Sequence, residues 1–260
     1  MSLDHPTRIV KYQTATRDAF LGGRLAIAQP VKGFRAGLDS VLLGAAVGAT
    51  KGWLLDLGAG VGTAALVALA HHPDLVATLV DSDPEALALA AENVATNGFA
   101  GRAQIVALDI TAPGAARAAA GLQTDHYTAV IANPPFFTAG QGTSASARGR
   151  AARHMDAGAL DLWVKTAAAS VAPGGEIVFI LPAESLAPAL AAFNARFGAI
   201  TILPFAPRAG EAAGRILLRG IKGSRAPSTL LATRALHQAD GQAFSPEMEA
   251  ILRDAALLVW

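Results

Sequence analysis

The sequence predicts an α/β fold: a doubly wound, mostly parallel sheet of seven strands that ends in an antiparallel strand pair. From Gly52 onward, short β-rich apolar runs alternate with longer alanine- and leucine-rich segments, as in repeated βα units. After the fifth such run, two apolar runs are separated only by a Pro/Gly/Arg loop, which favours a hairpin. A glycine-rich turn follows the first run, where parallel sheets bind ligands.

Each element has a local signal. Strands are expected at residues 53–56, 76–81, 104–108, 127–132 and 176–181, with the terminal pair at 200–205 and 215–220. Helices are expected at 63–70, 84–97, 160–171 and 184–197. The helix at 84–97 has the clearest limits, because Asp83 suits the N-cap, Pro84 suits the first helical position and an Asn-Gly pair follows. The first fifty residues predict a β-ribbon at 20–28 and, after Asp39, an apolar helix.

Composition excludes several kinds of site. The chain has no cysteine, which rules out disulfides, cysteine-ligated metal clusters and thiol catalysis. Its six histidines show no metal-binding spacing, so no metal site is expected. No charge-free apolar run reaches the roughly 18 residues of a membrane span, and residues 1–17 lack the apolar segment of a signal peptide. A cytoplasmic location is therefore expected, whereas the net charge of +1 decides nothing about nucleic acid.

The glycine-rich turn predicts a cofactor site. Asp56 ends the first strand, and the residues that follow, among them Gly58, Ala59, Gly60 and Gly62, allow a ligand to approach the backbone closely. The spacing is G-x-G-x-G rather than the G-x-G-x-x-G of dinucleotide-binding proteins, and a tight turn without a ligand is the alternative. Asp81 ends the second strand, where a carboxylate can accept bonds from both ribose hydroxyls, while Asp83 is better placed to cap a helix. Asp109, after the third strand, either accepts a bond from an exocyclic amine or is a solvent-facing loop residue.

The most informative motif is Asn133-Pro134-Pro135-Phe136, directly after the fourth strand. Two prolines fix φ and remove two backbone donors, which leaves carbonyls that only accept beside an amide and an aromatic ring. Such a site suits a flat group that bears an NH2. The alternative is a rigid turn at the strand end, whose aromatic residues join the core.

Taken in order, the glycine turn, Asp81, Asp109 and the Asn-Pro-Pro-Phe motif resemble the class I S-adenosylmethionine-dependent methyltransferases, and the resemblance covers most of residues 52–220. It implies a Rossmann-like fold with S-adenosylmethionine as cofactor. It also implies that Asp56 and the glycine turn surround the methionine end and that Asp81, with Ser82 beside it, holds the ribose. By the same resemblance, Leu108, Asp109 and Ile110 frame the adenine.

The motif is similar to that of methyltransferases acting on planar nitrogen, such as N6 of adenine, N2 of guanine or the side-chain amide of glutamine. Such a nitrogen is a poor nucleophile because its lone pair is delocalised. If Asn133 Oδ1 and the Pro134 carbonyl accept its two hydrogens, the nitrogen can pyramidalise toward the sulfonium methyl. Phe136, assisted by Phe137, would stack on the target ring.

Segments near both ends of the chain resemble one particular family of these methyltransferases. Residues 16–25, 29–43, 236–241 and 244–247 resemble the bacterial tRNA1(Val) (adenine-N6) methyltransferase family, which modifies valine tRNA next to its anticodon. The present chain departs from that family's pattern by carrying Phe rather than Tyr after the two prolines. The resemblance implies that residues 1–50 form an N-terminal extension and cofactor lid, with Gly37 and Asp39 closing over the cofactor. Residues 51–260 would form the catalytic domain.

A loop rich in Gly, Ser and Ala carries Arg148, Arg150 and Arg153, which are candidates with Lys32 and Arg35 for gripping RNA phosphates. A solvated face is the alternative. The expected function is methylation of the exocyclic N6 of adenosine in RNA, with tRNA as the expected partner. The alternatives are glutamine-directed protein methylation, small-molecule O-methylation and a non-catalytic RNA-binding module on the same fold.

Overall fold

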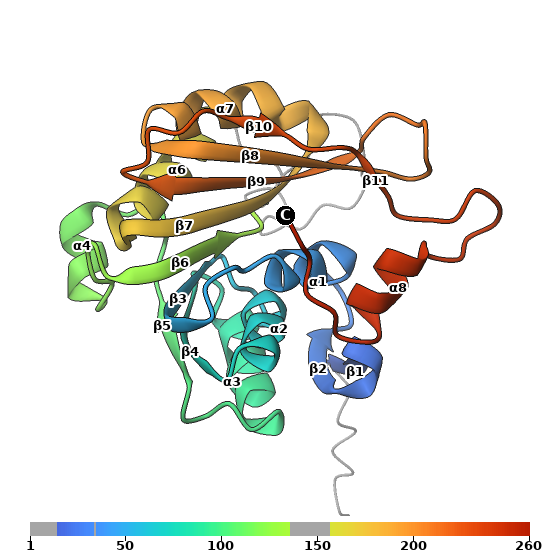
Figure 1. Cartoon of the computed structure of the whole chain (residues 1–260). Coiled ribbons are helices and arrows are strands. Elements are labelled where there is room, and N and C mark those ends of the chain that lie inside the picture. Colours follow the sequence, from blue (N-terminus) through green and yellow to red (C-terminus); the bar gives the residue numbers. More distant parts are fainter. Residues whose placement is uncertain (1–14, 34, 136–156) are drawn as a thin grey trace, which may run out of the picture.

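A twisted, mostly parallel sheet forms the middle layer of the computed structural model, which describes residues 15–33, 35–135 and 157–260 (Figure 1). Its longer strands are β3 (Lys51–Leu57), β4 (Asp74–Asp81), β5 (Ala103–Ala107), β6 (Tyr127–Ala132), β7 (Val171–Pro182), β8 (Phe197–Ala206) and β9 (Arg215–Lys222). The strand order is β10-β8-β9-β7-β6-β3-β4-β5, and β9 runs antiparallel between β7 and β8. The predicted fold class and its antiparallel terminal pair are therefore confirmed.

The sheet contains two short strands in addition to the seven strands that were predicted. They are β10 (Thr229–Leu230) and β11 (Arg234–Ala235), and both pair in parallel with β8. Each has only two residues, which is too short for an alternating apolar pattern to be recognised in the sequence.

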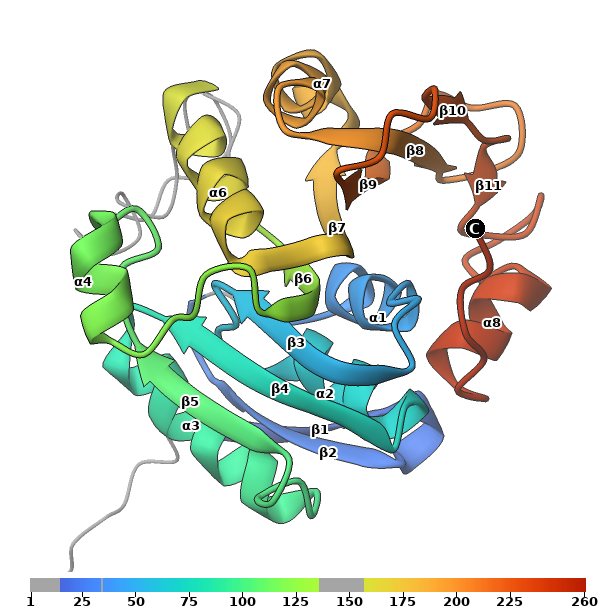
Figure 2. The same cartoon turned by 60° about the vertical axis from the view of Figure 1, so that its left-hand side comes forward.

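Helices cover both faces of the sheet (Figure 2). One face carries α1 (Leu38–Ala45), α2 (Thr63–His71) and α3 (Pro84–Thr96), and the other carries α6 (Ala157–Ser170) and α7 (Leu186–Asn194). Two further short helices are α4 (Gly114–Ala119) and α8 (Pro246–Leu252). In the described part of the chain, no helix combines the length and apolar character that a membrane span requires.

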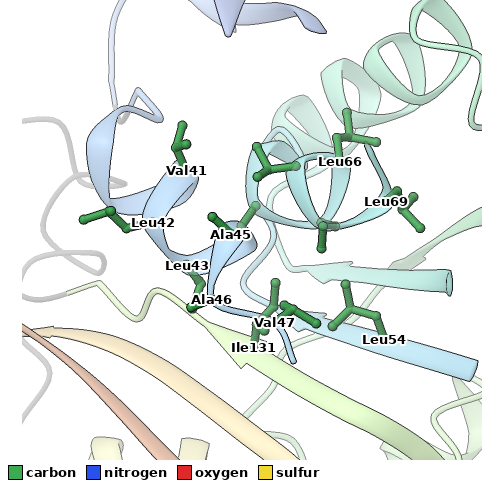
Figure 3. Packing of buried hydrophobic residues seen from close by; sticks show 14 of the residues in the cluster. Val41, Leu42, Leu43, Ala45, Ala46, Val47, Leu54, Leu66, Leu69 and Ile131 are labelled. Atoms are coloured by element: carbon green, nitrogen blue, oxygen red, sulfur yellow. The ribbon is translucent and has the colours of Figure 1, made fainter. Parts of the chain in front are cut away.

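The helices α1 and α2 pack against each other through buried hydrophobic side chains (Figure 3), and Gly44 lets them approach closely. A Cβ atom added to Gly44 of α1 would lie 2.4 Å from the Ala64 carbonyl oxygen and 2.7 Å from the Val67 side chain of α2. The missing side chain thus lets the two helix backbones approach closely, above the buried Leu54 of β3 and Ile131 of β6.

The predicted limits of α3 are confirmed by its caps. The Asp83 side chain accepts a hydrogen bond from the Glu85 N–H at 2.9 Å, and Pro84 is the first helical residue. At the other end Asn97 is the C-cap, and Gly98 follows with φ of 76°.

Other limits were wrong. The helix predicted at 184–197 consists of a 3-10 turn (Ala183–Ser185) followed by α7, and Phe197 already belongs to β8. The predicted helix 160–171 ends at Ser170, where β7 begins without an intervening loop. The helices α4 and α8 were not predicted.

A hairpin of β1 (Ala15–Phe20) and β2 (Leu25–Pro30), joined by a 3-10 turn (Leu21–Gly23), replaces the predicted ribbon at 20–28. Asn93 of α3 acts as a neighbouring strand would: Oδ1 accepts from the Ala28 N–H at 2.6 Å and Nδ2 donates to the Ala28 carbonyl at 3.0 Å. Asn97 makes the same pair of bonds with Ala26. Asn93 Nδ2 also donates to the Val61 carbonyl at 2.9 Å, which ties the hairpin to the glycine-rich turn.

Candidate active site

The carboxyl ends of β3, β4, β5 and β6 meet at one edge of the sheet. Leu57, the last residue of β3, pairs with Ala132 of β6 and with Val80 of β4. Asp81, the last residue of β4, pairs with Ala107 of β5. The helices after β3 and after β6 lie on opposite faces (Figure 2), and such a switch point is where open α/β sheets bind ligands. The glycine-rich turn and the Asn-Pro-Pro motif follow the two strands that flank this point.

The glycine-rich turn is shaped by three left-handed residues. Gly58, Gly60 and Gly62 have φ values of 70°, 54° and 86°. A Cβ atom on Gly58 would lie 2.5 Å from the Trp163 ring, and one on Gly62 would lie 2.7 Å from Leu79, so these two glycines also serve packing. A Cβ atom on Gly60 would meet no atom within 4 Å, so a ligand can approach this side of the turn.

Asp81 is bonded to the turn through its side chain. Its Oδ2 accepts from the Gly60 N–H at 2.8 Å, and its Oδ1 accepts from the Asp83 N–H at 2.9 Å. Each carboxylate oxygen has a second lone pair, so both can still accept a hydroxyl. This arrangement fits the predicted ribose contact. Ser82 beside it is exposed, and Asp83 caps α3 as expected.

The predicted adenine segment lies in the loop after β5. Its first residue, Leu108, donates its N–H to the Asp81 carbonyl at 2.9 Å. Asp109 is exposed, and its Oδ1 accepts from the N–H and the hydroxyl of Thr111 at 2.8 and 2.7 Å. Asp109 thus stabilises its own turn, and its contact with an adenine amine stays a prediction. Ile110 is buried.

Asp56 places a buried carboxyl group beneath the turn. Its Oδ2 accepts from the Ala65 N–H at 3.2 Å, in the first turn of α2. Burial raises the pKa of Asp56 from 3.8 to about 8, with a further rise from the charge of Asp81, and the bond from Ala65 opposes this. A cation bound near this carboxyl group would favour its ionised form.

The acceptor motif is partly described. Asn133 and Pro135 are half-buried and Pro134 is buried, directly after β6. Ala132, the last residue of β6, pairs with Leu57, the last residue of β3. The motif that starts at Asn133 therefore leaves the sheet next to the glycine-rich turn. The other candidates, Phe136, Phe137, Arg148, Arg150 and Arg153, lie outside the described residues.

The N-terminal candidates lie between the hairpin and α1 and in the first turn of α1. Gly37 is the N-cap of α1, and Asp39 Oδ2 accepts from Arg215 Nε at 3.0 Å. Arg35 donates to the Pro30 carbonyl at 2.8 Å and forms an ion pair with Asp18. The Arg35 charge is therefore already partnered, whereas Lys32 is exposed.

A cavity of about 220 Å³ lies beside α1 at the carboxyl end of β8. Leu38, Phe205, Pro207 and Leu236 form apolar walls, and the Asp39–Arg215 ion pair lines it as well. Apart from Asp39, no residue of this cavity was predicted, because its walls come from four separate segments of the chain. Among the described residues, no group of three His, Cys, Asp or Glu side chains is placed to hold a metal ion.

Similarities to known proteins agree with these features. The family model described as methyltransferase small domain matches residues 39–204. The tRNA1(Val) (adenine(37)-N6)-methyltransferase of Aeromonas hydrophila is 31% identical over 191 residues, covering 71% of this chain and 75% of that protein. Proteins of the same name from Aeromonas salmonicida and Shewanella loihica are 33% and 32% identical, covering 71% and 67% of this chain and 75% and 72% of those proteins.

Two solved structures are also similar. A crystal structure described as a predicted O-methyltransferase, protein Atu636 from Agrobacterium tumefaciens, is 31% identical with a TM-score of 0.70, covering 82% of this chain and 94% of that one. Pyrococcus horikoshii TYW2, solved in complex with MeSAdo, is 14% identical with a TM-score of 0.54, covering 82% and 73%. Because its identity is only 14%, the TYW2 structure supports the fold of this chain and nothing more.

Proposed function

Because the chain belongs to the methyltransferase small domain family and is a class I S-adenosylmethionine-dependent methyltransferase, we propose that it methylates the exocyclic N6 of an adenosine in tRNA. The observation that carries this proposal is the position of Asn133-Pro134-Pro135 after β6, beside the glycine-rich turn after β3. The curated relatives named as tRNA1(Val) adenine-N6 methyltransferases support the choice of acceptor. A cytoplasmic location follows from a tRNA substrate.

The geometry of the turn supports a set of cofactor contacts. The two carboxylate oxygens of Asp81 would accept the ribose hydroxyls, the backbone around Gly60 would lie against the ligand, and the loop of Leu108 to Ile110 would hold the adenine. Asp56 would lie below the methionine end. When bound, S-adenosylmethionine supplies an electrophilic methyl group on a sulfonium sulfur.

Asn133 and Pro134 act on the acceptor amine. Asn133 Oδ1 and the Pro134 carbonyl oxygen would accept hydrogen bonds from its two N–H groups, which pyramidalises the nitrogen and withdraws its lone pair from conjugation with the ring. The prolines contribute by offering no N–H that would compete with the amine. The nitrogen would form a bond to the methyl carbon while the carbon–sulfur bond breaks and its electron pair stays on the sulfur. The methylated nitrogen would then lose one proton to solvent, so no general base is needed before transfer.

The N-terminal segment completes the site. We propose that residues 1–50 act as an extension that closes over the cofactor, with Gly37 and Asp39 at the start of α1. Its attachment supports this role, because Asn93 bonds both to β2 and to the Val61 carbonyl of the glycine-rich turn.

The test is methyl transfer from labelled S-adenosylmethionine to total tRNA from a strain that lacks the gene. Label in N6-methyladenosine is expected, and Asn133→Ala should reduce its rate by about 10²- to 10³-fold while the dissociation constant for S-adenosylmethionine stays unchanged. An absence of label in RNA would contradict the proposal. An Asn133→Ala protein that keeps its full cellular effect would favour a non-catalytic RNA-binding role.

A further inference from the structure

The helix α6 contacts two of the loops that form the candidate cofactor site. Trp163 packs against Gly58, where a Cβ atom would lie 2.5 Å from the indole ring and 3.7 Å from the Ile110 side chain. Thr166, three residues further along α6, donates its hydroxyl to the Ile110 carbonyl at 2.9 Å. The two side chains share one face of the helix, and they meet the glycine-rich turn and the loop after β5 together.

Thr166 is the centre of a small buried network. Its side chain is fully buried, and its hydroxyl accepts from Arg117 Nη1 at 2.7 Å. The same Arg117 nitrogen donates to the Ala112 carbonyl at 3.2 Å. The charged donor strengthens the bond to the hydroxyl, which in turn holds Ile110. The loop after β5 is thus bonded to α6 through Ile110 and to α4 through Ala112.

The other end of this loop is bonded to β4, since the Leu108 N–H donates to the Asp81 carbonyl at 2.9 Å. Leu108 and Ile110 are therefore fixed from opposite sides, one by the strand that carries the proposed ribose contact and the other by Thr166. A loop held in this way has little freedom to move when a flat ring enters beside it, which lowers the ordering cost of binding.

We propose that Thr166 is a positioning residue for the adenine ring of the cofactor, acting through its hydrogen bond to the Ile110 carbonyl. The inference rests on the proposed function only in the assignment of residues 108–110 to the adenine. Thr166 lies on α6, outside the loops with recognisable motifs, and would act on the adenine without touching the cofactor.

The variant Thr166→Val keeps the shape of the side chain and removes the hydroxyl. The dissociation constants for S-adenosylmethionine and for 5′-methylthioadenosine, which lacks the methionine part, should both rise by about three- to tenfold in calorimetric titrations. The kcat at saturating cofactor should stay within about twofold of wild type, so that the loss appears in KM for the cofactor. Thr166→Ser retains the hydroxyl and should restore most of the affinity.

Ser170→Ala is the matched control. Ser170 is also buried on α6, but its hydroxyl donates to the Thr166 carbonyl within the helix at 2.9 Å and contacts neither loop. It should leave both dissociation constants unchanged. If Thr166→Val does not fold, as judged by thermal unfolding, Arg117→Met removes the donor to Thr166 from a less buried position and should weaken both ligands in the same direction.

Three results would overturn the inference: unchanged affinities in Thr166→Val, equal losses in Thr166→Val and Ser170→Ala, or weaker binding of S-adenosylmethionine with normal binding of 5′-methylthioadenosine. The binding titrations need no acceptor. A protein that shows the expected affinities but methylates no RNA would therefore refute the proposed function and leave the role of Thr166 standing.

Discussion

Asp56 should make the folded protein less stable as the pH rises, and Asp56→Asn should remove this loss of stability. Its side chain is 2% exposed, and burial raises its pKa from 3.8 to about 8. The unfolded chain releases the Asp56 proton near pH 4, whereas the folded chain retains it to about pH 8. Between these values the folded state binds more protons than the unfolded state, so the free energy of unfolding falls with rising pH.

The size of the loss in stability follows from the pH range between the two pKa values. Each pH unit within it corresponds to about 1.4 kcal/mol, so Asp56 lowers the free energy of unfolding by about 2 to 3 kcal/mol between pH 5 and pH 7. The effect is absent below about pH 4 and levels off above about pH 8. An Asn side chain keeps the shape and still accepts the Ala65 N–H, but it does not titrate.

Urea unfolding of wild type and Asp56→Asn at pH 5, 6, 7 and 8 measures the effect. The stability of the variant relative to wild type should increase across this range. Asp74→Asn, which removes an exposed carboxylate at the start of β4, is the control for the change of one carboxylate to an amide. A difference between Asp56→Asn and wild type that stays constant from pH 5 to pH 8 would refute the reasoning.

Two further predictions concern the hairpin and the cavity. Asn93→Ala should lower the free energy of unfolding by about 2 to 4 kcal/mol in urea and weaken S-adenosylmethionine binding, because it leaves buried backbone groups of Ala28 and Val61 unpaired. Asn97→Ala is its control, since Asn97 bonds Ala26 and not the glycine-rich turn; equal effects on cofactor affinity would contradict this account. Gly214→Leu, where a Cβ atom meets open space, should fill the cavity beside α1. Because Asp39 lines this cavity and belongs to the segment proposed to close over the cofactor, the dissociation constant for S-adenosylmethionine should rise about threefold in calorimetric titrations. The exposed Gly101→Leu should leave this constant unchanged, and an unchanged constant in Gly214→Leu would contradict the proposed closing role of Asp39.

Elements were predictable where a local signal defines both ends. The strand Tyr127–Ala132 agrees at both limits, because an apolar run is followed at once by Asn133 and two prolines. The helix α3 agrees at its start because Asp83 and Pro84 are strong local signals. The start of β7 was missed because Pro173, Gly174 and Gly175 look like a break, although the strand continues through them with an irregular register.

The candidate site residues also differ in how far the sequence points to them. Residues at strand ends, such as Asp81 and Asn133, could be proposed from the sequence because topology brings the carboxyl ends of parallel strands to one edge. Thr166 and Asn93 were not found, because a polar residue within an alanine-rich helix carries no sign of its partner. For Asn93 a signal was present: a second asparagine four residues later, at Asn97, places two amides on one helix face.

The identity of the methylated nucleoside tests the central claim most directly. tRNA from a strain lacking the gene, incubated with the protein and methyl-labelled S-adenosylmethionine and then digested to nucleosides, should contain its label in N6-methyladenosine. The same reaction with Asn133→Ala, whose cofactor binding is verified in parallel, should give at least about 100-fold less. Label in another nucleoside, or no label in RNA at all, would contradict the account.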